Sequence, residues 1–475
     1  MWSLCAWAVL DDHLSVSRYD HRTVRRIVPV ALFIAIAFAA IGPIRNYDFF
    51  WHLATGRWIA EHHALPLNDP FAVASDRGPW INGEWLFEAA LYGLHGVIGI
   101  AGLSWLRALF IAGLFLLVYR FSSDLLLTAL AFAGAMATID LRPSGIAALF
   151  VVLAIVLARK NNVILYALLT VLWINVHPSA LLAPLIALLL TRKAPITVVS
   201  ALALLVNPYG IQGVLAPLRL TLFATSGEFV NAEWLASSPV TFPLLYGTVI
   251  CAALVFAKKR PDWGELLLAL VLAYLAIRHV RNQPLWFAAF PLLVLPIKIR
   301  AEIAYAGAAA IVAFVAIFGD HHVGVSPSRF PIEAVARLKA TALPGNIYNP
   351  DQFGGFVIWS FYPERRTLTD GRNELYHSYI SEYAHARLDE RAWRALLRKY
   401  RIDLAVDEYR PPLDVKNNAT GQRSQMPASL AYWPRRDWAL IAFDEAAMVF
   451  ARRAAFPPAA IERWEFRGVV PDALR

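Results

Sequence analysis

The sequence predicts a polytopic α-helical membrane protein with about eleven transmembrane helices and a small carboxy-terminal α/β domain. Three observations predict this fold class. The chain is 58% hydrophobic and only 17% charged, whereas soluble domains are about half apolar and a quarter charged. Its apolar residues gather in runs of about 15 to 20 residues, which is close to the length that crosses a bilayer as a helix. After residue 320 the composition changes to that of a water-soluble domain.

The apolar runs divide the chain into spans and loops. We predict an amphipathic, in-plane helix over residues 84–96, followed by one crossing. The domains are then a cytoplasmic segment 1–26, a transmembrane domain 27–319 with a large first outer loop 45–97, and an extracytoplasmic domain 320–475. Several spans are shorter than the roughly 20 residues that a crossing helix needs, so their flanks must contribute. The predicted spans are residues 27–44, 98–119, 123–139, 144–158, 162–176, 179–191, 195–206, 243–257, 264–278, 284–297 and 303–319.

The basic residues predict the orientation. With the amino terminus in the cytoplasm, this topology places every lysine of the membrane region inside and the carboxy terminus outside. If residues 84–119 crossed twice, these lysines would lie outside, against the usual charge bias. The net charge of +9 is therefore a signal of topology, and we expect no nucleic-acid partner. The basic loops contain Arg120, Arg159-Lys160, Arg192-Lys193, Lys258-Lys259-Arg260 and Lys298-Arg300.

Familiar motifs of soluble enzymes are missing from the sequence. The two cysteines, Cys5 and Cys251, make neither a disulfide framework nor a zinc cluster. The chain also has no Gly-rich phosphate loop, no Cys or His metal spacing and no nucleophile elbow. The polar motifs that remain fall in the predicted outer segments.

The first outer loop offers a candidate base. Asp48 directly follows the first predicted span and is flanked by Tyr47 and Trp51. A carboxylate near the membrane surface is partly desolvated, so we expect its pKa to rise, which suits a general base. The alternative is that Asp48 solvates the helix end while the aromatic residues form an interfacial belt. Asp48 alone favours this structural alternative.

Further outer segments contribute acidic and basic groups. Glu84 opens the predicted in-plane helix, where it either favours the helix start by its charge or belongs to a site. An isolated cation or imidazole at the end of a span is usually an interfacial anchor. Several of them on one face, opposite acidic residues, indicate a pocket for a phosphorylated or pyrophosphorylated substrate. These groups are Arg142, His177, Arg278 and Arg281.

This arrangement resembles the GT-C superfamily, membrane glycosyltransferases that use polyprenyl-phosphate-linked sugars. Asp48-Phe49-Phe50-Trp51-His52-Leu53 is similar to the corresponding loop of oligosaccharyltransferases, protein O-mannosyltransferases and lipid-A aminoarabinose transferases. Most of the chain resembles a bacterial group of GT-C-like proteins. That resemblance rests on Asp48…Trp51-His52…Gly56, Trp80…Glu84-Trp85, Trp173-Ile174-Asn175-Val176-His177 and Gly354-Gly355…Asp370-Gly371-Arg372. The chain departs from the mannosyltransferases, which carry Asp-Glu in place of Asp48-Phe49, and it lacks the Trp-Trp-Asp signature of oligosaccharyltransferases.

The resemblance implies a glycosyltransferase of the bacterial plasma (inner) membrane. It would transfer a sugar from a polyprenyl-phosphate donor to a lipid or glycan acceptor of the envelope on the periplasmic, outer face. Asp48 is then the candidate base or metal-positioning carboxylate, and a divalent metal, Mg²⁺ or Mn²⁺, is left open. The implied pocket candidates are His52, Glu84, Arg142, His177, Arg278 and Arg281.

Two other functions are compatible with many spans. A transporter or flippase of a lipid-linked or anionic solute should show broken helices, inverted repeats and ionisable residues at mid-membrane. Here the polar residues cluster at the outer ends of the spans, and the first loop and the outer domain are large, which favours the enzyme. An O-antigen ligase or polymerase is close in chemistry, and the sequence does not separate it from the first hypothesis.

The outer domain is predicted to be a small α/β fold. Its expected elements are strands at 345–349, 366–370, 402–406, 438–443 and 447–451, a short helix within 352–359 and a helix at 388–400. Asp351, Asp370 and Arg372 lie at predicted strand ends, where sites of α/β proteins often form. They serve equally well as turn residues that shape the loops.

Overall fold

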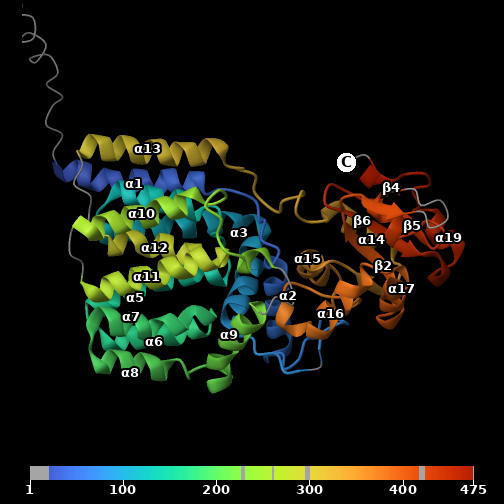
Figure 1. Ribbon diagram of the computed structural model, residues 1–475, viewed down its shortest axis with the longest axis horizontal. Helices are drawn as coiled ribbons and strands as arrows, with labels where there is room; N and C mark the ends of the chain where they lie inside the picture. The colour runs from blue at the N-terminus through green and yellow to red at the C-terminus, as the bar shows by residue number, and fades with distance from the viewer. Residues whose placement is uncertain are drawn as a thin grey trace, which may run out of the picture.

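The computed structural model describes residues 21–76, 78–225, 231–258, 262–294, 300–416 and 423–473. A bundle of helices forms one part of the molecule, and an α/β part lies beyond one end of it (Figure 1). Residues 1–20 of the predicted cytoplasmic segment lie outside the described residues, as do Lys259, Arg260 and Lys298.

The predicted apolar runs all overlap helices of the bundle. The helices are α1 (His21–Ala39), α3 (Trp85–Ser122), α4 (Leu125–Ala135), α5 (Pro143–Arg159), α6 (Val163–Ile174), α7 (Leu182–Thr191), α8 (Ala194–Ala203), α10 (Pro243–Lys258), α11 (Trp263–Arg278), α12 (Gln283–Leu293) and α13 (Ala301–Phe318). Within the described residues, α3 is the one helix that is long and apolar enough to cross a membrane, and the shorter apolar helices have 10–17 residues. The mainly helical fold is confirmed, whereas the number of crossings stays a prediction.

The long helix α3 changes course at Gly99. This glycine has φ +62° and ψ −175°, a conformation that a residue with a side chain rarely adopts. The helix is therefore broken near the start of the predicted span 98–119, three residues after the predicted in-plane segment 84–96. Before the break, α3 packs closely on α2 (Phe49–His62): a Cβ added at Gly56 would come within 2.1 Å of the Glu88 carbonyl oxygen.

Two helices lie in segments that the sequence analysis treats as loops. One is α2, in the first outer loop, and the other is α9 (Ile211–Ala224). Helix α2 escapes a search for amphipathic periodicity because the eight consecutive residues 49–56 are all buried. It begins at the residue after Asp48 and so fixes that carboxylate at a helix start.

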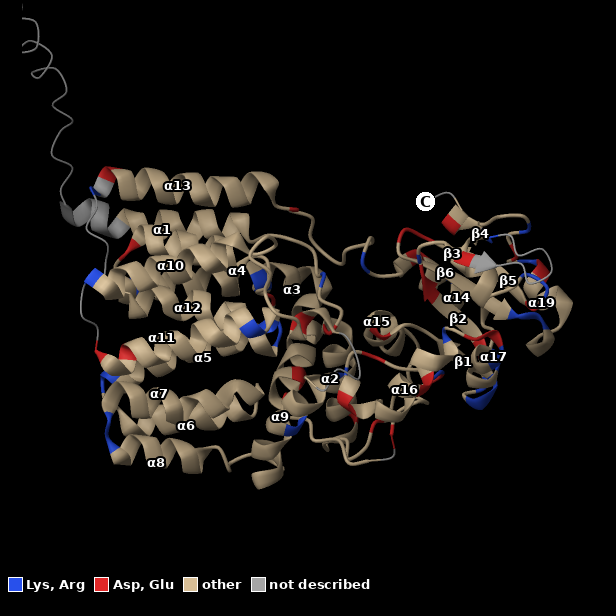
Figure 2. Cartoon of the chain, viewed as in Figure 1, with Lys and Arg blue, Asp and Glu red and all other residues tan. Residues whose placement is uncertain are grey.

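The described residues of the basic loops gather at the end of the bundle that is distant from the α/β part (Figure 2). Ion pairs tie neighbouring loops together there: Arg159 lies 2.6 Å from Glu265, and Arg192 lies 2.6 Å from Asp262. The opposite end carries α2, the first outer loop and the α/β part. The charge asymmetry used to predict the topology therefore corresponds to two different ends of the folded bundle.

The carboxy-terminal part is confirmed as α/β. Its four-stranded sheet has the order β1 (Asn346–Tyr348), β2 (Ile402–Glu408), β6 (Ala447–Arg452), β5 (Trp438–Phe443), with β1 parallel to β2 and the other pairs antiparallel. Strands β3 (Leu413–Lys416) and β4 (Arg423–Met426) form a separate pair. The helices are α14 (Ile332–Thr341), α15 (Asp351–Phe361), α16 (His377–Ala386), α17 (Glu390–Lys399), α18 (Ala428–Tyr432) and α19 (Pro458–Glu462).

One predicted strand is wrong. Residues 366–370 make only isolated bridges, in which Thr367 lies beside both Ile347 and Ala72. Because Ala72 belongs to the first outer loop, this segment joins the loop to the edge of the α/β part. The Val73 N–H donates to the Thr367 carbonyl at 2.9 Å, and Arg57 donates to the Tyr362 carbonyl at 2.8 Å.

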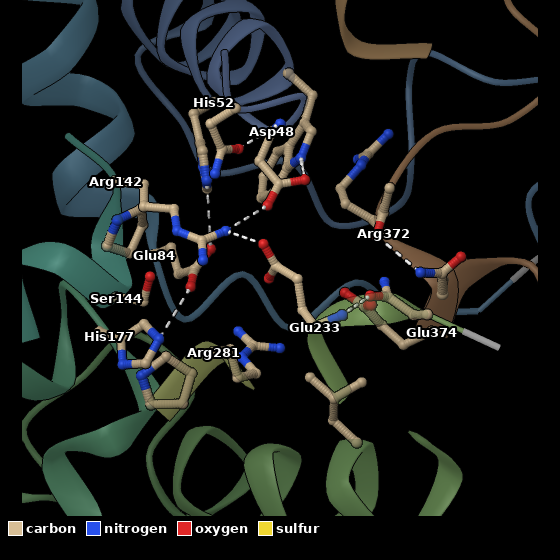
Figure 3. A pocket seen from close by; sticks show the side chains of 18 of the residues that line it. Asp48, His52, Glu84, Arg142, Ser144, His177, Glu233, Arg281, Arg372 and Glu374 are labelled. Carbon is tan, nitrogen blue, oxygen red and sulfur yellow. Dashed lines mark hydrogen bonds and ion pairs between the residues drawn. The ribbon is translucent and has the colours of Figure 1, made fainter. Parts of the chain in front are cut away.

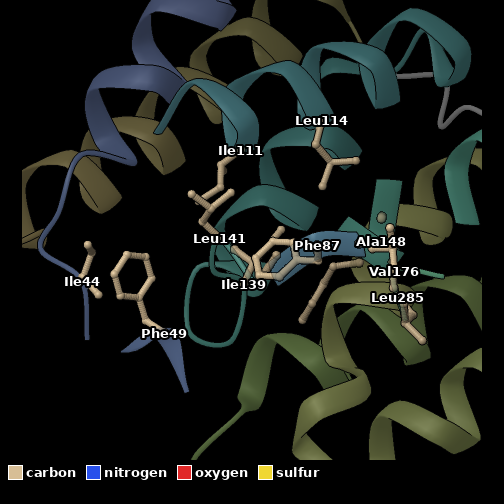
Figure 4. Packing of buried hydrophobic residues seen from close by; sticks show 14 of the residues in the cluster. Ile44, Phe49, Phe87, Ile111, Leu114, Ile139, Leu141, Ala148, Val176 and Leu285 are labelled. Atoms are coloured by element: carbon tan, nitrogen blue, oxygen red, sulfur yellow. The ribbon is translucent and has the colours of Figure 1, made fainter. Parts of the chain in front are cut away.

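Apolar packing under this junction positions the polar loops above it. Phe50 contacts Phe330 and Phe356 of the α/β part, with ring centroids 5.1 and 4.9 Å apart. Figure 4 shows Ile139 and Leu141, on either side of Asp140, in the same buried cluster as Phe49 and Phe87. The loop before α5 and the start of α2 are therefore held against one core.

Candidate active site

A cavity of about 980 Å³ lies where the bundle, the first outer loop and the α/β part meet. Its size is that of a site for a small organic ligand. Most of the lining residues come from the stretches 45–52, 79–84, 136–144, 174–178, 213–223, 231–234, 280–281 and 371–377, and the others are Arg107, Arg329, Asp351 and Gln352. Segments that are far apart in the sequence thus share one site (Figure 3).

Asp48 occupies the N-cap position of α2 and faces this cavity. Its carboxylate accepts a hydrogen bond from Trp51 Nε1 at 3.2 Å and lies 3.5 Å from Nη1 of Arg142. Burial, reinforced by Glu233, raises the pKa of Asp48 to about 6, although Arg142, Trp51 and Arg281 act in the opposite direction. The predicted rise is confirmed, and Asp48 is mostly ionised at neutral pH while still able to accept a proton.

Arg142 lies between two carboxylates. Its Nη1 is 2.5 Å from Glu233 Oε1 and 3.5 Å from Asp48 Oδ2, and its side chain is only 7% exposed. Burial opposes the charge of this guanidinium, yet Glu233 and Asp48 raise its pKa above the ordinary value. For Glu233 too burial is the largest influence, but Arg142 and Arg281 outweigh it and hold the pKa of that carboxyl below its usual range.

Glu84 lies between two histidines. Its carboxyl oxygens are 3.9 Å from His52 Nε2 and 3.8 Å from His177 Nε2. It is the N-cap residue of α3, but its side chain makes no capping hydrogen bond. Burial raises the pKa of Glu84 to about 8, and Arg281 opposes this rise. At neutral pH Glu84 is therefore mostly protonated and able to donate a hydrogen bond.

The two histidines are neutral. Burial is the main reason that the pKa values of His52 and His177 lie well below the usual value, and Arg142 lowers both further. The backbone N–H of Ser179 donates to His177 Nδ1 at 3.1 Å, so the ring proton must sit on Nε2. That N–H group is directed into the cavity.

Buried donors at one wall lack partners. Within the described residues, Arg142 Nε, Ser144 Oγ and His177 Nε2 are buried and have no hydrogen-bond partner. Figure 3 shows these side chains along the same wall of the cavity, with Arg281 nearby. The Arg281 guanidinium lies over the Trp234 ring at 4.6 Å. Because unpaired buried donors are costly, this wall is suited to an anionic ligand that accepts their hydrogen bonds.

A buried network supports His52 from behind. Its Nδ1 lies 3.2 Å from Glu88 Oε1, and Asn82 Nδ2 donates to Glu88 Oε2 at 2.5 Å. The Asn82 side-chain oxygen in turn accepts the Glu84 backbone N–H at 3.1 Å. The network thus fixes the relative positions of His52 and Glu84.

The α/β part reaches the cavity through the turn 370–372. Arg372 is 1% exposed, lies 2.5 Å from Asp370 and 3.0 Å from Asp69, and covers the Trp80 ring at 4.5 Å. A Cβ added to Gly371 would lie 2.9 Å from Asp48 Oδ1. The ion pair between Arg372 and Asp69 therefore holds this turn against the first outer loop, with Gly371 beside Asp48. Asp370 and Arg372 thus have a structural role.

Most of the predicted pocket residues share the cavity. Asp48, His52, Glu84, Arg142, His177 and Arg281 all line it. Arg278, the last residue of α11, is exposed and is not among the lining residues. Sequence reasoning missed Glu233 and Glu88. The segment Asn231-Ala232-Glu233-Trp234 lies in a predicted outer loop, and Glu88 follows Glu84 by one helical turn, but neither signal singles out a site residue.

The acidic residues do not fit a divalent metal. In the part of the chain that the structure describes, no group of three or more His, Cys, Asp or Glu residues is arranged to hold a metal ion. Asp48 and Glu233, the two carboxylates that converge, are both directed at the Arg142 guanidinium. The space between these two carboxylates is therefore filled by a guanidinium and not shaped for a metal ion.

Comparisons with known proteins support the fold. No family model matches the chain, and no curated protein matches it. An archaeal oligosaccharyltransferase, AglB from Archaeoglobus fulgidus in complex with an inhibitory peptide and a dolichol-phosphate, is 10% identical, with 85% of this chain and 74% of that chain covered and a TM-score of 0.48. A crystal structure of the Archaeoglobus fulgidus oligosaccharyltransferase with Zn and sulfate is 12% identical, with 84% and 73% covered and a TM-score of 0.52. The latter shows that the two chains share a fold.

Proposed function

We propose that this protein is a membrane glycosyltransferase that transfers a sugar from a polyprenyl-phosphate donor to an envelope acceptor on the extracytoplasmic face of a bacterial plasma membrane. One observation carries the proposal: an ionisable base, Asp48, faces the same cavity as a wall of buried, unpaired donors. Glycosyl transfer from a phosphate-linked donor needs both features, a base for the acceptor hydroxyl and stabilisation of the departing phosphate.

Asp48 supplies the base. Its carboxylate accepts the proton of the acceptor hydroxyl while the hydroxyl oxygen forms a bond to the anomeric carbon of the sugar. The bond between that carbon and the phosphate oxygen breaks, and its electron pair leaves with the phosphate. A pKa of about 6 suits this role, because the group is ionised at neutral pH and is more basic than an ordinary aspartate.

The unpaired donors of the cavity wall stabilise the leaving phosphate. Negative charge on the phosphate grows as the glycosidic bond breaks, so donors that are already in place favour the transition state over the ground state. Arg142 Nε, Ser144 Oγ and His177 Nε2 are directed at this region, and Arg281 adds positive charge. Protonated Glu84 adds a donor without adding negative charge.

Exposed apolar side chains support a membrane setting and a lipid-linked donor. Exposed large apolar side chains occur on most helices of the bundle; Ile164 on α6 and Phe318 at the end of α13, for example, are each 74% exposed. So much exposed apolar surface suits contact with lipid. A groove of about 510 Å³ between Trp85, Leu172 and Val206 also contains Asn175. In this groove Trp85 Nε1 donates to Asn175 Oδ1 at 2.9 Å. Trp85 directly follows Glu84, and Asn175 lies two residues before His177, and both Glu84 and His177 line the cavity. We infer that the groove adjoins the cavity and suits a polyprenyl chain.

The test follows product release in purified protein held in nanodiscs. Wild type, Asp48→Asn and the control Glu61→Gln, at an exposed position on the same helix, are incubated with a panel of polyprenyl-phosphate sugars. We expect wild type and the control to release polyprenyl phosphate, and a folded Asp48→Asn to lose this activity by at least about a hundredfold. Saturable binding or flipping of a lipid-linked solute without release from any donor would contradict the proposal in favour of a transporter or flippase. Analysis of the acceptor product would separate simple transfer from an O-antigen ligase or polymerase reaction.

A further inference from the structure

We propose that Arg142 is the permanent cation of this site, holding the place between Asp48 and Glu233 that a divalent metal would need, so that sugar transfer proceeds without a metal ion. The claim that sugar transfer needs no metal ion rests on the proposed function. The claim that Arg142 keeps a metal out of this place concerns only the protein and can be tested without any substrate.

The geometry around Nη1 of Arg142 carries the argument. This nitrogen is 2.5 Å from Glu233 Oε1 and 3.5 Å from Asp48 Oδ2. A magnesium ion bound by the same oxygens would need both of them at about 2.1 Å. The guanidinium therefore occupies the space in which a bridging metal would sit, and no metal can enter unless Arg142 leaves.

Arg142 is well anchored in this position. It is the N-cap residue of α5 with an extended backbone, and Pro143 follows it directly. Leu141, on its other side, is buried in the hydrophobic core beneath the site. With a side chain only 7% exposed, Arg142 has little room to swing away and admit an ion.

The neighbouring carboxylates already have guanidinium partners. Asp140, the next carboxylate along the wall, is held by Arg107, whose Nε lies 2.6 Å away. Asp48 and Glu233 share Arg142, so each of the three carboxylates along this wall already faces a guanidinium. A divalent ion placed between Asp48 and Glu233 would be repelled by Arg142 at close range.

A guanidinium can perform the electrostatic part of a metal's task. It stays charged at every working pH and binds phosphate oxygens through directed N–H groups. Nη1 faces the two carboxylates, while Nε is buried without a hydrogen-bond partner among the described residues. The same side chain therefore contacts the base and offers a donor to the leaving phosphate, so it couples the two halves of the reaction.

The first experiment measures metal binding in purified, EDTA-treated protein by the loss of the free Mn²⁺ signal in electron paramagnetic resonance. We expect no stoichiometric binding by wild type at millimolar Mn²⁺. Arg142→Ala should bind at least about tenfold more tightly, because Asp48 and Glu233 lose their shared cation. The gain should vanish in Arg142→Ala/Asp48→Asn, and Arg391→Ala, at an exposed position on α17, should behave as wild type.

The inference would be overturned if wild type bound Mn²⁺ stoichiometrically and Asp48→Asn abolished that binding. This comparison does not need Arg142→Ala, so it remains decisive even if Arg142→Ala fails to fold.

The second experiment measures polyprenyl-phosphate release by wild type in excess EDTA, which we expect to stay within about twofold of the untreated rate. A loss that Mg²⁺ or Mn²⁺ restores would overturn metal-free transfer. If no donor is turned over at all, the proposed function fails, and the Mn²⁺ titration still decides what occupies the space between the carboxylates.

Discussion

Replacing Glu233 with Gln should shift the pH dependence of the reaction toward acid. Glu233 and Asp48 contact the same Arg142 nitrogen at 2.5 and 3.5 Å, so their oxygens are at most about 6 Å apart. At an effective dielectric constant of about 20, two negative charges at that distance repel by about 3 kcal/mol, or about 2 pKa units. Both side chains are roughly one-third exposed, and solvent screening reduces this value to about 1 unit.

The direction of the shift follows from the protonation state of Asp48 that the charge of Glu233 favours. The negative charge of Glu233 disfavours ionised Asp48, so its removal stabilises the carboxylate and lowers the pKa of Asp48 from about 6 toward about 5. Arg142, released from Glu233, turns further toward Asp48 and acts in the same direction. Activity requires ionised Asp48, and we therefore expect the acid limb of kcat/KM to move down by about one pH unit.

The assay is polyprenyl-phosphate release between pH 4.5 and 8, with each enzyme normalised to its own maximum. Normalisation matters because Glu233→Gln also disturbs Arg142 and should lower the maximum itself. Glu61→Gln, which removes an exposed carboxylate from α2, should keep the limb of wild type. A limb that stays in place or moves up in Glu233→Gln would refute the electrostatic account of Asp48.

Three further predictions concern neighbouring residues. Glu84 has a pKa of about 8, so the activity of wild type should decline above pH 8 as this group loses its proton. Glu84→Gln should lose less than about tenfold activity at pH 7 and should not show that decline; a kcat/KM profile of the variant that keeps the decline contradicts this. Gly371→Ala would place a methyl group 2.9 Å from Asp48 Oδ1, so kcat should fall at least about tenfold while thermal unfolding stays near that of wild type; unchanged kcat would rule out this contact. Asp69→Asn leaves Asp370 as the one carboxylate paired with the buried Arg372, and we expect a loss of about 3 kcal/mol in the free energy of unfolding, measured by denaturant titration. An unchanged midpoint would show that the Asp69–Arg372 ion pair does not hold the outer loop.

The sequence predicted which residues lie together around the cavity better than it predicted the helices of the outer loops. Apolar runs locate the bundle helices because burial or lipid contact along a whole helix requires apolar length. The alternation of loops between the two ends of those helices then places Asp48, Glu84, Arg142 and His177 at one end, where the structure finds them around one cavity. The sequence pattern did not predict a helix at 49–62. Residues 49–56 are all buried, so the first two turns show no alternation of an apolar and a polar face.

The remaining errors depend on tertiary contacts. Arg278 and Arg281 are three residues apart, and both are cations at the end of a span. Helix α11 ends at Arg278, and the 3₁₀ turn that follows carries Arg281 over Trp234 and into the cavity. Glu233 reaches the site because its segment is held beside that turn: His279 Nδ1 lies 2.7 Å from the Trp234 carbonyl. No local pattern encodes this contact.

Asp48 and Glu84, two of the carboxyl groups that line the cavity, acquire different roles from their neighbours. Burial raises the pKa of both, but Asp48 also faces the Arg142 guanidinium and the Trp51 N–H, which favour its ionised form. Glu84 instead lies between His52 and His177, and since burial keeps both rings neutral they provide no compensating charge. The pKa values of about 6 and about 8 leave an interval around neutral pH in which Asp48 accepts a proton and Glu84 keeps one. Within that interval Asp48 serves as the base, while Glu84 is a neutral donor that adds no negative charge beside an arriving phosphate.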